Sequence, residues 1–260
     1  MLEPHGGWSA APQAGPPDGI LLLEMFGRLT AAPDAPFRGE GALWSVFRTR
    51  AEMMGWERGS SRPGALSSTH EAELTAGSET ARLGWAQVGI EEGSSLVRVL
   101  PALIQCLEDA LGRFGIVESS ALQLTAVGMS PAPSRSDATH ASWLPWFSAH
   151  DHDAAVDAAL AFNGEMLRGR AELDILARLG RSGTPFFSFG PSATVPAEFR
   201  IVAPPEAPLD RPLSAASRGI AVRMPEWSNA AAAWVLSAAV DATRASASTT
   251  AFACRLSRPA

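Results

Sequence analysis

The same succession of patterns occurs twice along this chain, and this echo constrains the possible folds more than any other feature. Each copy begins with a short apolar segment that is typical of a strand. A helical segment follows, in which apolar residues recur every three or four positions, and a second strand segment ends the copy. The pattern predicts an α+β fold with two similar subdomains, each a mostly antiparallel sheet with helices packed on one face. The copies comprise Arg82–Ile90, Leu96–Phe114 and Ser120–Met129, and then Arg218–Met224, Asn229–Arg244 and Thr249–Leu256.

Composition divides the 260 residues into four parts. Residues 1–18 are rich in proline, glycine and alanine, which predicts a flexible N-terminal arm. Residues 19–130 form the predicted first subdomain, and residues 143–260 form the second. The prolines and serines at 131–142 predict a linker between them.

Four segments carry more specific expectations. Gly19–Thr30 is nearly continuous in apolar residues, which favours a strand buried on both faces. Gly41–Glu52 is interpreted as a further strand, because its apolar residues alternate with polar ones more than in the preceding segment. Ala154–Gly180 has a helical pattern, in which two glycines are expected to bend or split the helix. Ser228 is predicted to cap a helix that extends through Arg244.

Lysine and tyrosine are absent, and all 21 positively charged residues are arginine. This excludes Schiff-base chemistry on a lysine, a Walker lysine and a tyrosine acting as an acid. The favoured interpretation of this absence is a GC-rich bacterial genome, and selection against lysine modification is the alternative. The 27 acidic residues give a net charge of -6, which argues against a nucleic-acid-binding domain.

The predicted location is the cytoplasm. The longest apolar runs, such as Ile20–Met25 and Ala230–Leu236, are too short to span a bilayer, and no signal peptide is recognised. Cys106 and Cys254 are too few for a disulfide scaffold. Both are expected to be buried as small apolar side chains, with a disulfide or a nucleophile as the alternatives. No cofactor is expected.

The densest polar cluster of the sequence is His150–Asp153. In an extended segment, His150 and His152 share a face, and Asp151 could complete a metal site with them. The corresponding function is a metal-assisted hydrolase or lyase, in which Asp151 or Asp153 acts as ligand or base. The alternative interpretation is a polar cap of the helix expected from Ala154 onward.

An aromatic segment just before this cluster suggests a different function. Trp143, Trp146 and Phe147, together with Asp151 and Asp153, are predicted to bind a partner protein, because tryptophan is common in interface hot spots. Burial between the two subdomains is the alternative. The favoured function is a non-catalytic acidic protein-binding protein, such as an inhibitor, an immunity-type protein or an accessory subunit. Its negative charge would steer it toward a basic partner.

Overall fold

A computed structural model describes residues 19–32, 42–54, 66–74, 82–90, 96–129, 155–163, 170–183, 186–193, 201, 217–246 and 251–258. The strands are β1 (Gly19–Ala31), β2 (Leu66–Leu74), β3 (Arg82–Ile90), β4 (Gly115–Val127), β5 (Val156–Asn163), β6 (Ser188–Ala193), β7 (Ser217–Met224) and β8 (Ala251–Ser257). The helices are α1 (Ala42–Met53), α2 (Leu96–Leu111), α5 (Arg170–Gly183) and α6 (Asn229–Ser246).

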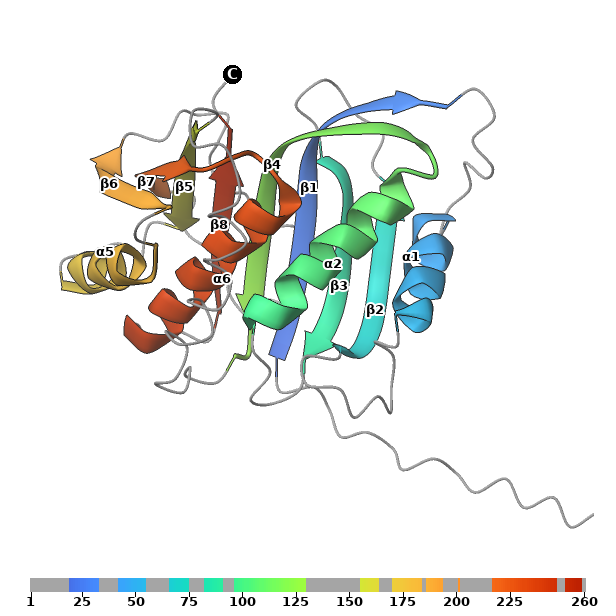
Figure 1. Cartoon of the computed structure of the whole chain (residues 1–260). Helices are drawn as coiled ribbons and strands as arrows, with labels where there is room; N and C mark the ends of the chain where they lie inside the picture. Colours follow the sequence, from blue (N-terminus) through green and yellow to red (C-terminus); the bar gives the residue numbers. More distant parts are fainter. Residues whose placement is uncertain are drawn as a thin grey trace, which may run out of the picture.

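The strands form one sheet, and the helices form a layer on one of its faces (Figure 1). The strand order is β2-β3-β1-β4-β8-β5-β7-β6, and every pairing between neighbours is antiparallel. In Figure 1, α2 and α6 lie side by side in front of the central strands, with α1 beyond α2 and α5 beyond α6. The predicted α+β class, with antiparallel strands and helices on one face, is therefore confirmed.

The order of elements in the second half repeats the order in the first. The first half runs β1-α1-β2-β3-α2-β4, and the second runs β5-α5-β6-β7-α6-β8. Each is the β-α-β-β-α-β succession of the ferredoxin-like motif. The halves join where β4 pairs with β8, so the sheet is continuous across the junction. The division into two subdomains stays a prediction, and the arm at 1–18 and the linker at 131–142 lie outside the described residues.

Strand β1 is buried on both faces, as its apolar run predicts. Leu21, Leu23 and Met25 belong to the core between the sheet and the helices. Leu22 and Glu24 point to the opposite face, because successive residues of a strand alternate, and they are also buried. A carboxylate therefore lies in the interior of an apolar strand.

The segment interpreted as a strand at Gly41–Glu52 is the helix α1, so that prediction is wrong. Leu43, Phe47 and Ala51 are its buried residues, and their spacing of four positions places them on one helical face. The neighbouring Trp44 is only partly buried. Its apolar side chain obscured the helical period in the sequence.

The single long helix predicted at Ala154–Gly180 is also wrong. The structure has strand β5 followed by helix α5. In β5, Ala158, Leu160 and Phe162 face the core at alternate positions, which is the period of a strand. Its pairing with β7 and β8 on both sides outweighs the helical preference of its alanines.

Helix α6 forms as its sequence predicts. The backbone NH of Ala231 donates to Ser228 Oγ at 3.2 Å, which confirms the predicted cap. Trp234 is buried in the middle of the helix and stacks on Phe187 at a centroid distance of 4.1 Å. The helix thus anchors the second half of the helical layer.

A glycine allows β1 and β4 to approach closely where their pairing shifts register. Gly27 has a φ of 149°, and a Cβ atom built on it would lie 2.1 Å from the carbonyl oxygen of Glu118. Gly27→Ala is expected to lower the free energy of unfolding by about 2–3 kcal/mol, from backbone strain and overpacking. Urea denaturation followed by circular dichroism measures this change.

Gly180 in α5 provides the matched control. A Cβ atom added there meets nothing within 4 Å. Gly180→Ala is therefore expected to raise stability by about 0.5–1 kcal/mol, because alanine is the better helix former. Equal stabilities of the two variants would contradict the close approach at Gly27.

Candidate functional site

Four polar side chains gather on the face of the sheet that points away from the helices. We call Glu24, Arg82, Gln123 and Arg255 the sheet-face cluster. Strand register brings them together, because Glu24 lies opposite Gln123 and Gln123 lies opposite Arg255. Arg82 follows from β3, where it lies opposite Phe26. The cluster therefore crosses four neighbouring strands near the centre of the sheet.

Glu24 is the hydrogen-bond acceptor at the centre of the cluster. Arg82 Nη1 donates to its Oε1 at 3.2 Å, and Gln123 Nε2 donates to its Oε2 at 2.6 Å. Only 4% of the Glu24 side chain is exposed. A carboxylate is costly to bury unless it is paired and hydrogen-bonded, and here both of its oxygens are used.

Arg255 is held by an aromatic ring. Its guanidinium carbon lies 4.0 Å from the centroid of Phe26, which is a cation–π contact. The residue is 7% exposed. Burial lowers the pKa of Arg255, and the charge of Glu24 acts in the opposite direction. Its Nε atom is enclosed and has no hydrogen-bond partner among the described residues.

Further enclosed polar atoms lie on the same face as the cluster. Thr125 Oγ1, Ser257 Oγ and Trp85 Nε1 have no hydrogen-bond partner among the residues that the structure describes. Trp85 lies opposite Glu24, while Thr125 and Ser257 are on β4 and β8. Buried polar groups are usually bonded to protein, water or a ligand. This face therefore offers donors and acceptors for binding.

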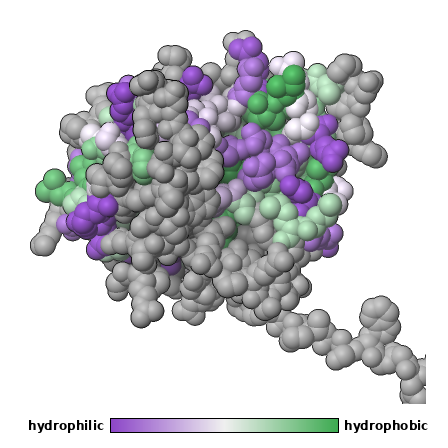
Figure 2. Space-filling model, in the orientation of Figure 1, coloured by the Kyte–Doolittle hydropathy of each residue, from purple (hydrophilic) through white to green (hydrophobic). Residues whose placement is uncertain are grey.

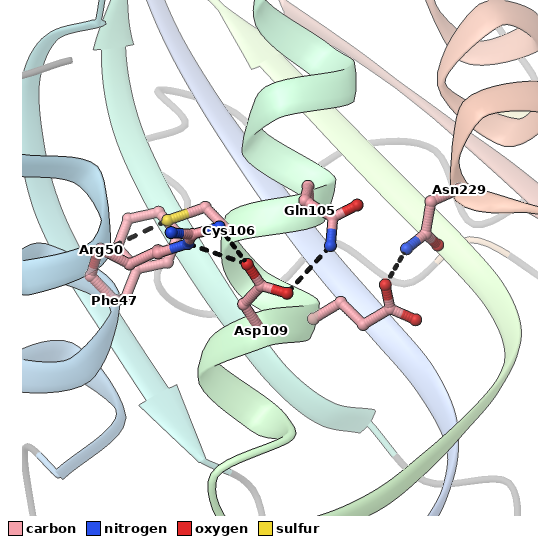
Figure 3. A network of polar contacts seen from close by, with 7 residues as sticks. Phe47, Arg50, Gln105, Cys106, Asp109 and Asn229 are labelled. Atoms are coloured by element: carbon pink, nitrogen blue, oxygen red, sulfur yellow. Dashed lines mark hydrogen bonds and ion pairs between the residues drawn. The ribbon is translucent and has the colours of Figure 1, made fainter. Parts of the chain in front are cut away.

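A second polar network connects the helices (Figure 3). Arg50 Nε of α1 and Gln105 Nε2 of α2 donate to the two carboxylate oxygens of Asp109, at 2.8 and 2.9 Å. Asn229, at the start of α6, donates to Glu108. Burial raises the pKa of Glu108, while the Asn229 hydrogen bond lowers it. Hydrophilic residues gather over α2 on this face (Figure 2).

Both cysteines are free and buried, as predicted. Burial raises the pKa of each thiol to about 12, and nearby Arg50 only partly opposes this for Cys106. Cys106 Sγ donates to the backbone oxygen of Phe47 at 3.5 Å, which joins α1 to α2 (Figure 3). Because the thiolate is the reactive form, neither cysteine is activated as a nucleophile near neutral pH.

The site residues predicted from sequence lie outside the described part of the chain. These are the metal ligands His150, His152 and Asp151, and the partner-binding residues Trp143, Trp146, Phe147, Asp151 and Asp153. The metal-assisted hydrolase or lyase therefore stays a prediction. Among the described residues, no group of three or more His, Cys, Asp or Glu side chains could hold a metal ion.

The sheet-face cluster was missed at the level of sequence, although it leaves a signal there. Glu24 and Gln123 each have apolar neighbours on both sides, and Arg255 lies between Cys254 and Leu256. A lone polar residue within an apolar strand must be solvated or paired on the opposite face. The apolar residues dominate the pattern of these strands, so the local sequence shows no sign that the polar side chains meet.

Comparison with protein-family models, with curated proteins and with solved structures finds no match to this chain. None of the helices that the structure describes combines the length and apolarity needed to cross a membrane.

Proposed function

We propose that the protein binds another protein without catalysing a reaction, as an inhibitor, an immunity-type protein or an accessory subunit. The observation that carries this proposal is a two-stranded ribbon that extends beyond the rest of the sheet. The net charge of -6 favours a basic partner, because complementary charge speeds association. The proposed binding element is this ribbon, presented to an extended segment of the partner.

The β1–β4 ribbon consists of residues 27–31 of β1 and 115–119 of β4. Its pairs run from Gly27 opposite Ser119 to Ala31 opposite Gly115. Strand β3 begins at Arg82, opposite Phe26, and β8 ends at Ser257, opposite Ala121. Neither strand therefore extends along the ribbon. In Figure 1, the two strands curve together above the sheet.

The ribbon has one packed face and one exposed face. Leu29 and Val117 lie opposite each other and pack against the core. The pairs on either side of them alternate to the other face, where Ile116 is 69% exposed. Arg28 and Glu118 also lie there, 3.8 Å apart, and both are largely exposed. The exposed face thus combines an apolar side chain with a weak ion pair.

This geometry suits recognition of an extended segment. Strand edges without a neighbour present backbone NH and CO groups that pair with an added strand. No described strand covers either edge of the ribbon, although at its base the indole of Trp227 donates to the backbone oxygen of Ser119 at 3.0 Å. Packing on the core holds the ribbon in place, so that little conformational entropy is lost on binding. An apolar contact at Ile116 would add to the backbone pairing.

The test replaces Ile116 by aspartate. The partner is first captured from the native host by the tagged full chain and identified, and its affinity is then measured with purified components. Ile116→Asp is expected to weaken binding at least tenfold, about 1.4 kcal/mol, because a charge replaces the exposed apolar contact.

Leu173 on α5 is the matched control, since it is 68% exposed and lies outside the ribbon. Leu173→Asp is expected to leave the affinity within twofold. An equal effect of both variants, or none from Ile116→Asp, would remove the ribbon from the proposed interface. A partner of acidic charge would contradict the steering argument.

A further inference from the structure

We infer that the sheet-face cluster binds a small monocarboxylate, with the guanidinium of Arg255 as the group that pairs with the carboxylate. The inference concerns the face of the sheet and is independent of the protein partner proposed above.

Arg255 has no hydrogen-bonded carboxylate among the described residues. Glu24 is the single carboxylate of the cluster, and both oxygens accept hydrogen bonds, from Arg82 and Gln123. Arg255 has no ion pair with any described carboxylate, although it is more than nine-tenths buried. A buried cation is costly unless an anion pairs with it. An anionic group at Arg255 would supply that missing partner.

The guanidinium of Arg255 is held in place and, among the described residues, has a free donor for such an anion. The contact with the Phe26 ring, 4.0 Å from the guanidinium carbon to the ring centroid, restrains the group. The edge of a guanidinium matches the two oxygens of a carboxylate, which it binds through parallel hydrogen bonds. The enclosed Nε of Arg255, without a partner among the described residues, is one of these donors.

Two hydroxyl groups extend the site. Ser257 follows Arg255 by two positions on β8, so both side chains project from the same face. Thr125 lies opposite Ala253, which places it diagonally across from Arg255 on the neighbouring strand. Neither hydroxyl oxygen has a partner among the described residues. Hydroxyls can donate to anion oxygens, or accept from a polar substituent of the ligand.

Charge and space together select the class of ligand. A single unpaired guanidinium beside the negative Glu24 balances one negative charge, and it would balance a phosphate dianion poorly. With only 7% of Arg255 exposed, the surface of a macromolecule cannot lie against its guanidinium. The matching ligand is therefore a small molecule with one carboxylate.

The test uses acetate as the probe and the NMR signal of the Arg255 Nε–Hε group as the readout. The full chain is labelled with 15N, the signal is assigned by its loss in Arg255→Lys, and sodium acetate replaces sodium chloride at constant ionic strength. The expected result is a saturable shift of this signal. In Arg255→Gln, saturable shifts of neighbouring backbone amides are expected to require at least tenfold more acetate.

Two further variants keep the inference falsifiable. Phe26→Leu retains the charge but removes the stacking, and it should weaken acetate binding several-fold even if Arg255→Gln does not fold. Arg28→Gln changes an exposed arginine and should leave binding unchanged. A shift that grows linearly with acetate, or persists unchanged in Arg255→Gln, would show adventitious binding only. Tighter binding of phosphate than of acetate at pH 7.5 would overturn the monocarboxylate assignment.

Discussion

Glu24→Ala is expected to lower the free energy of unfolding by about 3–5 kcal/mol. The substitution removes the acceptor for Arg82 and Gln123, and it leaves two guanidinium groups on the same face without the negative charge between them. Breaking a buried pair costs more than the pair contributes, since the remaining charge stays in a poorly solvated place. Urea denaturation at pH 7 measures the loss.

Two control variants distinguish the contribution of the buried carboxylate of Glu24 to stability from that of its shape and from that of an exposed carboxylate. Glu24→Gln keeps the shape and an acceptor oxygen, so its loss should be smaller than that of Glu24→Ala. Glu118→Ala removes the carboxylate of the exposed Arg28 pair at 3.8 Å and should cost about 0–1 kcal/mol. If Glu24→Ala cost no more than Glu118→Ala, the sheet-face cluster would have no energetic role.

Trp234→Ala is expected to cost about 3–5 kcal/mol, because it empties a large volume in the centre of the helical layer. The indole is 1% exposed and stacks on Phe187 with an interplanar angle of 9°. Phe189 lies on the same ring at a centroid distance of 6.5 Å. Loss of the indole therefore loosens the contact between α6 and the segment that leads into β6.

Trp234→Phe is the control for this variant, since it keeps an aromatic ring against Phe187 and leaves a smaller cavity. It should lose less than half as much stability as Trp234→Ala in the same denaturation experiment. A Trp234→Ala protein that unfolds at the denaturant concentration of the wild type would show that the stack does not contribute to stability.

Local periodicity predicted those helices in which the buried residues lie on one face. Helix α2 was predicted because Leu100, Leu103 and Leu107 recur on one side, and all three are buried. Helix α6 was predicted from its Ser228 cap, which the structure retains. These elements needed no information from distant parts of the chain.

Elements that depend on distant partners were not predicted. Helix α1 packs against α2 and β2, and its Arg50 donates to Asp109 of α2, 59 positions away in sequence. Strand β5 is rich in alanine and has its conformation fixed by two neighbouring strands. Intrinsic preference is a weak guide where such tertiary contacts dominate.

The sheet-face cluster is a stronger example of the same limit. Its members come from β1, β3, β4 and β8, and the separation between Glu24 and Arg255 spans most of the chain. Each polar residue is visible in its own strand, whereas the pairing of Glu24 with Arg82 and Gln123 needs the strand order. Sequence alone therefore predicts isolated polar positions and not the constellation that they form.

The position of β8 between β4 and β5 has a consequence for synthesis on the ribosome. The first half emerges with all of its own strands, yet one edge of β4 has no neighbour until residues 251–257 have been translated. An uncovered strand edge invites pairing with other nascent chains. The long-range contact between β4 and β8 must also close a large loop, which slows folding. The edge of β4 is therefore covered only when β8 has left the exit tunnel and pairs with it.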